Sequence, residues 1–351
     1  AAGEARLTVA DLSIGDYEIT ATYSGGGGLL PSTSTPITQN VTAGEVTARL
    51  SGPSSPSEVG VPVTFTASVS SAISTPTSTV TFTVDGTPVG DVDLDPSGTA
   101  NFTTSDLDPG EREIGATYGG DAEHEPATAD PLTHLVLRPV TVAVSTTPNT
   151  AQYGQPASVT VTVTSLYPGP VPTGNVHVTA QIDGSGVSIP LDAAGTGTAT
   201  LPLLPVGAGD LIAAYDGDAA HSATASDLHR HTVVPATTVT ALSVAPAGPT
   251  LALSPLTFTA QVTAPDSTVE PTGVVRFFVD GTAVGTAPVI AGTSALDQVR
   301  IPAGNHVITA ALEPGTGFAT SSAGPVSHEV RPAGATVALS ADKTDTVRGE
   351  P

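Results

Sequence analysis

Carboxylates are the side chains of this sequence with the clearest capacity for chemistry, as oxygen ligands for Ca²⁺. Asp91, Asp93 and Asp95 alternate along one segment, and calcium-binding loops begin in this way. The pattern then departs from such a loop, because Pro96 stands where the sharp-turn glycine belongs and Phe102 stands where a bidentate glutamate is needed. If the segment is a strand, the three aspartates share one face. A solvated acidic face beside a turn is therefore the alternative to a calcium site.

A second set of carboxylates lies in two segments that occupy equivalent places in the chain. Asp121 and Glu123 belong to the first segment, and Asp216 and Asp218 belong to the second. Hard oxygen ligands close to the joint between two domains could make that joint rigid by binding Ca²⁺. We therefore treat these four residues as further calcium candidates. The sequence suggests no other cofactor.

Histidines are the next candidates, and the 8 in the chain are scattered along it. His229 and His231 stand two residues apart, so both lie on one face of a strand. Two imidazoles placed in this way bind a metal ion if a carboxylate comes near; otherwise they are exposed polar residues on a terminal strand, which is what we expect here. The sequence contains no Gly-x-Ser-x-Gly, phosphate-binding glycine loop or His-Glu-x-x-His motif. It therefore predicts no catalytic residues and no enzyme.

Composition narrows the classes of function further. The 351 residues include no cysteine, and Lys+Arg 10 against Asp+Glu 33 gives a net charge of -23. Without cysteine there is no disulfide, thiolate–metal site or cysteine nucleophile. The acidic balance argues against nucleic-acid partners, because phosphate contacts need clustered Lys and Arg. No apolar run approaches the ~18–20 residues that span a bilayer, so we expect no membrane insertion in this segment. The absence of methionine suggests an internal piece of a longer chain.

The chain repeats itself, and the repeat shows which elements carry these side chains. A Gly-x-x-x-Ile-x-Ala-x-Tyr segment starts at Gly15 and at Gly110, and it returns in looser form at Gly207 and Gly304. The four glycines are spaced by 95, 97 and 97 residues. Proline-containing and Asp-Gly-Thr markers keep the same order and period. A period of this length indicates tandem domains of about 96 residues.

Within a repeat the pattern is typical of strands throughout. Apolar and hydroxyl side chains alternate over 63–70, 159–164 and 256–263, which places one set in a core and the other in water. Asp85-Gly86 and Asp280-Gly281 each separate two such runs, as in tight hairpins. For the first complete repeat the sequence predicts about seven strands, near 46–51, 61–70, 78–85, 88–94, 99–104, 112–118 and 131–137.

Seven short antiparallel strands in about 96 residues predict an all-β, immunoglobulin-like β-sandwich, with a single barrel as the alternative. The joins between repeats are short and contain proline, so we expect tandem sandwiches arranged as an elongated rod. The predicted domains are an incomplete C-terminal half-repeat over 1–45, complete repeats over 46–137, 138–234 and 235–331, and the first strand region of an incomplete repeat over 332–351.

Three motifs resemble a known family over the whole chain. They are Pro271-Thr272-Gly273-x-Val275-x-Phe277 with Asp280-Gly281-Thr282, then Pro172-Thr173-Gly174-x-Val176, and Ala116-Thr117-Tyr118-x-Gly120-Asp121-Ala122. They are similar to bacterial Ig-like tandem repeat domains, type 3-like, of large cell-surface and secreted proteins. The third repeat departs from the pattern, with Leu312 in place of the tyrosine. The resemblance implies spacers, stalks or adhesive arrays, and it supplies no catalytic residues.

These observations predict a non-enzymatic, extracellular, cell-surface stalk or spacer, which could be part of a surface filament. Its first partners would be the neighbouring Ig-like repeats of the same chain. One alternative is an adhesin whose loops recognise a glycan or protein receptor, with Tyr167 as the candidate contact. Another is a fibre subunit that self-associates by strand addition at an exposed edge.

Overall fold

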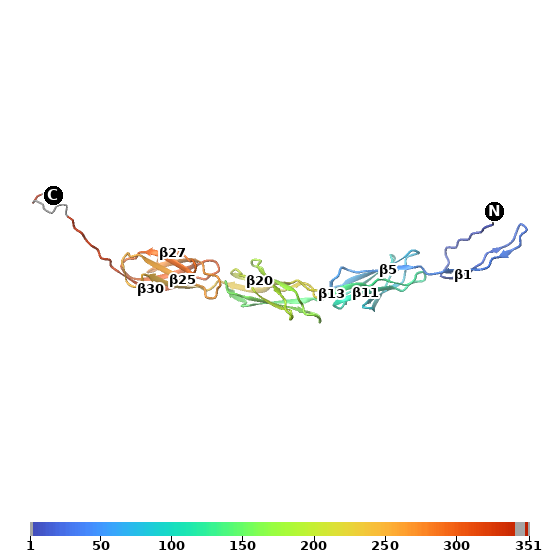
Figure 1. Cartoon of the computed structure of the whole chain (residues 1–351), viewed down its shortest axis with the longest axis horizontal. Helices are drawn as coiled ribbons and strands as arrows, with labels where there is room; N and C mark the ends of the chain where they lie inside the picture. The colour runs from blue at the N-terminus through green and yellow to red at the C-terminus, as the bar shows by residue number, and fades with distance from the viewer. Residues whose placement is uncertain (1–2, 341–347, 350–351) are drawn as a thin grey trace. The chain divides into compact units, whose positions relative to one another are not determined.

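The computed structural model describes residues 3–340 and 348–349, and within them it contains strands, turns and extended segments without a helix (Figure 1). The first complete repeat is a sandwich of two sheets with the orders β10-β7-β5 and β6-β13-β11-β8-β9, and β12 pairs with β11. Its strands are β5 (Val46–Ser51), β6 (Ser57–Glu58), β7 (Val63–Ser71), β8 (Thr79–Val84), β9 (Thr87–Asp93), β10 (Thr99–Thr104), β11 (Gly110–Tyr118), β12 (Ala127–Thr128) and β13 (Leu132–Leu137).

The second repeat has the same topology, with sheets β14-β16-β19 and β15-β22-β20-β17-β18, and β21 pairs with β20. Its strands are β14 (Val140–Thr147), β15 (Thr150–Gln152), β16 (Ser158–Ser165), β17 (Asn175–Ala180), β18 (Gly186–Pro190), β19 (Thr196–Thr200), β20 (Gly207–Tyr215), β21 (Thr224–Ala225) and β22 (His229–Val234).

The third repeat is built from sheets β23-β25-β28 and β24-β30-β29-β26-β27. Its strands are β23 (Val239–Ala245), β24 (Thr250–Leu251), β25 (Leu256–Thr263), β26 (Gly273–Val279), β27 (Thr282–Pro288), β28 (Thr293–Val299), β29 (Gly304–Pro314) and β30 (Ser321–Arg331). The predicted all-β tandem sandwich is therefore confirmed, and each of the seven strands predicted for the first repeat lies within two residues of its observed bounds.

Alternation along the strands produces the cores, because successive side chains of a strand point to opposite faces. In β7 the buried residues are Val63, Phe65, Ala67 and Val69, and the residues between them face water or are partly covered. The equivalent β16 and β25 bury their apolar residues in the same phase. In the first repeat, Phe65 packs in a cluster with Tyr118 of the opposing sheet.

The two predicted hairpin turns have the backbone that their sequences require. Asp85 and Gly86 both have positive φ, at 50° and 76°, and Asp280 and Gly281 match them at 48° and 80°. Two consecutive positive φ values match the twist of the flanking strands, and Asp-Gly is a preferred pair for such a turn. The turns thereby fix the register of β8 with β9 and of β26 with β27.

The N-terminal segment has the strand pattern of a half-repeat. It contains the antiparallel pairs β1 (Gly15–Ile19) with β4 (Ile37–Val41) and β2 (Thr22–Tyr23) with β3 (Ser32–Thr33). Ile19 and Tyr23 are 40% and 47% exposed there, whereas the equivalent Ile114 and Tyr118 are 0% exposed. The described residues of this segment therefore form a single layer.

The chain divides into two compact units. The first unit comprises the described part of 1–140 together with two loops of the second repeat, 165–172 and 217–223. The second unit contains the rest of the second repeat and the whole of the third. Among the residues that the structure describes, no helix is long and apolar enough to cross a membrane.

Candidate functional site

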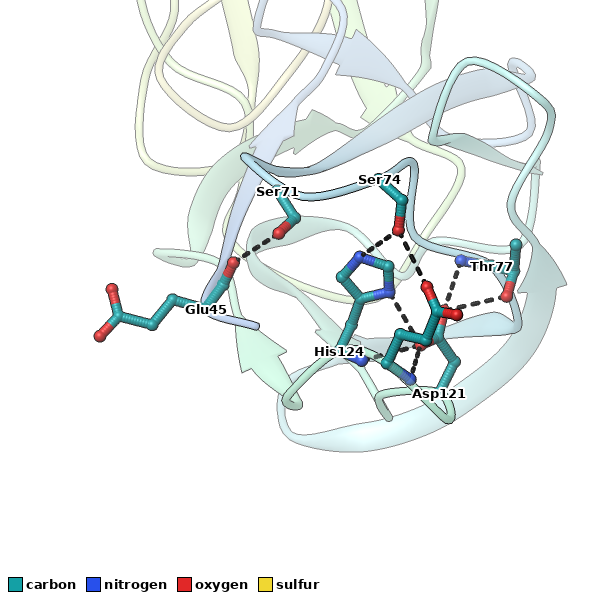
Figure 2. A network of polar contacts seen from close by, with 7 residues as sticks. Glu45, Ser71, Ser74, Thr77, Asp121 and His124 are labelled. Carbon is teal, nitrogen blue, oxygen red and sulfur yellow. Dashed lines mark hydrogen bonds and ion pairs between the residues drawn. The ribbon is translucent and has the colours of Figure 1, made fainter. Parts of the chain in front are cut away.

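The acidic segment at Asp121 forms a compact polar network at one end of the first repeat (Figure 2). The Oδ1 atom of Asp121 accepts hydrogen bonds from the backbone nitrogens of Glu123 and His124, at 2.8 and 2.9 Å, and contacts His124 Nδ1 at 2.8 Å. Its Oδ2 atom accepts from the backbone nitrogen and the Oγ1 hydroxyl of Thr77, both at 2.9 Å. Burial alone would raise the pKa of Asp121, but these hydrogen bonds outweigh it and hold the pKa well below its usual range.

His124 occupies the centre of this network. Its side chain is 2% exposed and that of Asp121 is 13% exposed. On the far side of the ring, His124 Nε2 lies 3.2 Å from the hydroxyl oxygen of Ser74, which also lies 3.2 Å from Glu123 Oε2. Figure 2 shows Ser74 reaching the ring from a different loop. The loop from β7 to β8 thus brings Ser74 next to His124, which lies 50 residues later in the chain.

The second repeat builds the same loop from Asp218 and His221. Asp218 Oδ1 accepts from the backbone nitrogens of Ala220 and His221, at 2.8 and 2.9 Å, and contacts His221 Nδ1 at 2.8 Å. His221 is 1% exposed, and its Nε2 has no hydrogen-bond partner among the described residues. In the third repeat Phe318 takes the place of the histidine, so that loop lacks the ion pair.

Each of these loops binds the residue through which the chain enters its own repeat, and we call this arrangement the entry clasp. In the first repeat, Gly44 N donates to Glu123 O at 2.8 Å and Glu125 N donates to Gly44 O at 3.0 Å. In the second, Arg138 N donates to Ala220 O at 2.9 Å. The entry residues Gly44, Arg138 and Ala236 each form a parallel bridge, with His124, His221 and Phe318 respectively.

Clasped entry residues give the acidic loops a structural role that needs no metal. Among the described residues no group of three or more histidine, cysteine, aspartate or glutamate side chains could hold a metal ion. The carboxylates of Asp121, Glu123 and Asp218 accept hydrogen bonds from protein donors. Asp216 Oδ2 lies 3.0 Å from His177 Nε2. Calcium at these residues stays a prediction.

The other calcium candidates lie on the edge strand β9 of the first repeat and in the turn that follows it. Asp91 Oδ1 accepts from Thr81 Oγ1 at 2.6 Å across the β8–β9 pair. Asp95 Oδ1 accepts from Ser97 Oγ at 2.6 Å, Ser97 N at 2.8 Å and Thr99 N at 2.9 Å. The Ser97 and Thr99 hydrogen bonds lower the pKa of Asp95. Its carboxylate therefore shapes a turn, and Asp93, at the end of β9, is exposed.

The candidate receptor contact, Tyr167, lies in the loop 165–172 with its side chain 39% exposed. Ser165 Oγ donates to the Tyr167 carbonyl at 2.8 Å, which holds the backbone of the loop in place. In the same loop the Pro168 carbonyl accepts from Arg138 Nε at 3.1 Å. The loop is thus attached to the entry residue of its repeat, and binding of a glycan or protein by Tyr167 stays a prediction.

Sequence reasoning missed a buried histidine that recurs in every complete repeat. His134, His231 and His328 stand 97 residues apart at equivalent positions of β13, β22 and β30, and they are 1%, 2% and 5% exposed. Treating the histidines as scattered, and His231 as an exposed residue, is therefore wrong. Their spacing equals the repeat period, which was the signal available in the sequence.

Each of these histidines contacts a hydroxyl group on a neighbouring segment. His134 Nε2 lies 2.8 Å from Ser57 Oγ, and His328 Nε2 lies 2.9 Å from Thr250 Oγ1. His231 Nδ1 lies 3.3 Å from Thr146 Oγ1. Burial lowers the pKa of His134, and burial followed by the charge of the neighbouring His229 lowers the pKa of His231.

Contacts between repeats are present inside both compact units. In the first unit, Ser222 Oγ donates to Glu58 Oε1 at 2.5 Å. In the second unit, Gln152 Oε1 accepts from Thr237 N at 2.6 Å, and the Gly154 carbonyl accepts from Thr268 N at 2.9 Å. The end of β15 is therefore hydrogen-bonded to both the entry segment and a loop of the third repeat.

Comparison with known proteins adds the following. The family model described as bacterial Ig-like domain (group 3) matches residues 50–136, 144–234 and 242–331. No curated protein matches the chain.

Several solved structures are similar to the chain. FdeC, an Escherichia coli adhesin, is 15% identical, covers 83% of this chain and 99% of its own, and gives a TM-score of 0.29. Invasin, a bacterial integrin-binding protein, is 12% identical, with 82% of this chain and 60% of its own covered at a TM-score of 0.37. The Yersinia pseudotuberculosis adhesin InvE is 17% identical, with 54% and 58% covered at a TM-score of 0.30. At TM-scores this low, these likenesses carry no argument about function.

Proposed function

This chain belongs to the bacterial Ig-like domain (group 3) family, and we propose that it serves as a non-enzymatic extracellular stalk or spacer. The role is mechanical: serial sandwiches would hold another part of the molecule, or their own surface, away from a cell. Family membership and the tandem repeats support a structural or adhesive role at the cell surface. Within that broader role, we propose the stalk in particular.

The observation that carries this proposal is the entry clasp in all three complete repeats. A stalk transmits force along its backbone, so the points where the chain passes from one repeat to the next must not act as free tethers. Here the entry residue of each repeat is bridged to a loop of that same repeat, at Gly44, Arg138 and Ala236. The first residue of each connection is thus hydrogen-bonded to the repeat that it enters.

The joint inside the second unit supports the same role. Its hydrogen bonds at Gln152 and Gly154 are supplemented by the Oγ1 hydroxyl of Thr268, which donates to the Gly154 carbonyl at 2.8 Å. A joint with both backbone and side-chain hydrogen bonds resists bending better than a flexible Gly/Ser linker. The net charge of -23 adds self-repulsion, which favours solubility over collapse.

The test must separate the stalk from an adhesin. Glycan and protein arrays probed with the intact chain and with a Tyr167→Ala variant should show no specific binding by either. Binding that is present in the intact chain and absent from Tyr167→Ala would favour the adhesin. Protease treatment of intact producing cells should release the repeats; retention inside the cells would contradict an extracellular location.

Fibre formation by strand addition is distinguished by a different measurement. Electron microscopy of the chain over a range of concentrations should show separate molecules. Fibres that lengthen with concentration would support the fibre subunit instead, because strand pairing at an exposed edge is an association between copies.

A further inference from the structure

We propose that Ser74 is an activated hydroxyl that takes up an acyl group from activated esters, which makes it a covalent modification site in the first repeat. The proposal rests on a serine, a histidine and an aspartate in series. Ser74 Oγ lies 3.2 Å from His124 Nε2, and His124 Nδ1 lies 2.8 Å from Asp121 Oδ1 (Figure 2). A nucleophile within hydrogen-bond reach of a base, with the base oriented by a third group, is the arrangement that activates serine. This inference is independent of the stalk function.

The hydrogen bonds of Asp121 determine where the proton of the imidazole lies. Both carboxylate oxygens accept from backbone and hydroxyl donors, so the group is an ionised acceptor with no proton to give. The His124 Nδ1 atom must therefore carry hydrogen and donate it to Asp121. In the neutral ring the lone pair is then on Nε2, which lies 3.2 Å from the Ser74 hydroxyl oxygen and can accept its hydrogen. This is the tautomer that a general base requires.

Burial separates the base from water while the hydroxyl stays accessible. His124 is 3% exposed, whereas Ser74 lies on an exposed loop. Ser74 also lines a surface hollow of about 250 Å³, together with Ser71, Ile73 and Pro76. A small acyl group carried by Ser74 would therefore lie at the surface, next to this hollow.

The reaction transfers one acyl group and one proton. Ser74 Oγ attacks the carbonyl carbon of the ester, and a new oxygen–carbon bond forms as its hydroxyl proton passes to His124 Nε2. The bond to the leaving alkoxide or phenolate then breaks, and that group takes the proton or leaves as the anion. The product is an ester at Ser74. No oxidant, reductant or metal is needed.

Glu123 competes for the same proton. Its Oε2 atom lies 3.2 Å from Ser74 Oγ, as far as His124 Nε2 does, and the hydroxyl has only one hydrogen to donate. A carboxylate here also repels the negative charge that develops on the attacked carbonyl oxygen. We therefore expect Glu123→Gln to make Ser74 more reactive.

The other two repeats provide natural controls in the same molecule. The second repeat keeps the aspartate–histidine pair, but no serine or other described group bonds to His221 Nε2. The third repeat has Phe318 in place of the histidine. Only the loop of the first repeat combines the three groups among the described residues, so reactivity should be confined to it.

The experiment treats the full chain with p-nitrophenyl acetate and measures the modified residues by intact mass and peptide mapping. Ser74 should react at least ~100-fold faster than Ser105, because general-base assistance contributes about 10²–10⁴-fold. Ser105 is the reference because it is exposed and contacts only Asp106. Ser74→Ala should lose the fast modification, and Glu123→Gln should increase its rate.

The pH dependence of labelling provides a second readout. The rate should be lower in acid than at neutral pH, because a protonated base cannot accept the Ser74 proton. Equal labelling of Ser74 and Ser105 in the intact chain would overturn the proposal without requiring any variant to fold. Loss of reactivity in Glu123→Gln would also overturn it, because the carboxylate and not His124 would then be the base.

Discussion

The ring of Tyr153 lies edge-on against the ring of Phe318, with centroids 5.6 Å apart and planes at 87°. Tyr153 follows β15 of the second repeat, and Phe318 belongs to the entry clasp of the third, so this contact joins the two repeats within one compact unit. Edge-to-face aromatic pairs contribute about 0.5–1.5 kcal/mol beyond their buried area. An aromatic contact therefore supplements the hydrogen bonds of this joint.

Gly317→Ala should loosen this joint. A Cβ at Gly317 would lie 2.4 Å from Tyr153 Cδ1, so the tyrosine ring must shift. We expect the free energy of unfolding of the third repeat to fall by about 1–3 kcal/mol more than in the control, measured by hydrogen exchange. The control is Gly248→Ala, whose φ of +83° resembles the +94° of Gly317 but whose Cβ meets nothing within 4 Å. Equal losses in the two variants would show that Tyr153 does not constrain the joint.

Asp121→Asn should destabilise the first repeat. The amide can accept hydrogen bonds through one atom only, so part of the donor set from Thr77, Glu123 and the buried His124 is left without a partner. The expected loss is about 3 kcal/mol in hydrogen-exchange protection of β11. Asp216→Asn is the control, because the carboxylate of Asp216 pairs with the exposed His177, and it should change the protection of β20 in its own repeat little. Similar losses in both would contradict a structural role for the Asp121 network.

Mild acid should weaken the sandwiches through their buried histidines. Because burial lowers the pKa of His134 and His231 in the folded chain, the unfolded chain binds protons more readily below the ordinary value of 6.5. Stability should therefore be complete above that value and fall as the pH drops below it. Denaturant unfolding at a series of pH values measures this. His134→Gln should flatten the dependence, and an undiminished dependence in this variant would assign the loss to other groups.

A second loss of stability should occur at lower pH. The pKa of Asp121 is held below its ordinary value of 3.8 by hydrogen bonds that outweigh the effect of burial. Its contribution is therefore present above that value and is lost as the pH falls through the folded-state pKa. Unfolding curves that extend into this range should show a second decline, which Asp121→Asn removes. A decline of equal size in that variant would assign the loss to other groups.

Chelation should leave thermal stability unchanged. The oxygens of Asp121 accept five contacts from protein donors, and Asp218 Oδ1 accepts three. A Ca²⁺ ion at either loop would have to replace them. We expect the same melting midpoint with excess Ca²⁺ and with chelator. A rise in the midpoint with Ca²⁺ would restore the loop carboxylates as calcium ligands.

Most of the fold could be predicted from the sequence because its signals are local. Strand alternation needs only neighbouring residues, and Val63 to Val69 are buried in the predicted phase. Asp85-Gly86 likewise determines its turn through two backbone angles. Because the sequence repeats, the strands and turns predicted for one domain can also be predicted at the equivalent positions of the others.

The polar networks could not be predicted in the same way. Ser74 and His124 are 50 residues apart, and only the packing of two loops brings them together. The sequence does not distinguish a buried histidine such as His134 from an exposed one. Its partner Ser57 comes close only because β6 pairs with β13 in the folded chain. The surroundings of equivalent tyrosines also differ between repeats. The hydroxyl of Tyr215 donates to the Thr173 carbonyl at 2.8 Å. For Tyr118, burial and the nearby Asp121 raise the pKa to about 12.

Pulling the intact chain by its two ends in a single-molecule force experiment tests the stalk most directly. We expect three discrete unfolding events, one for each complete repeat. Each should add about 300 Å of contour length, since an extended residue spans about 3.3–3.6 Å. Smooth extension at low force without discrete steps would contradict the account, because clasped sandwiches that bear load cannot extend in that way.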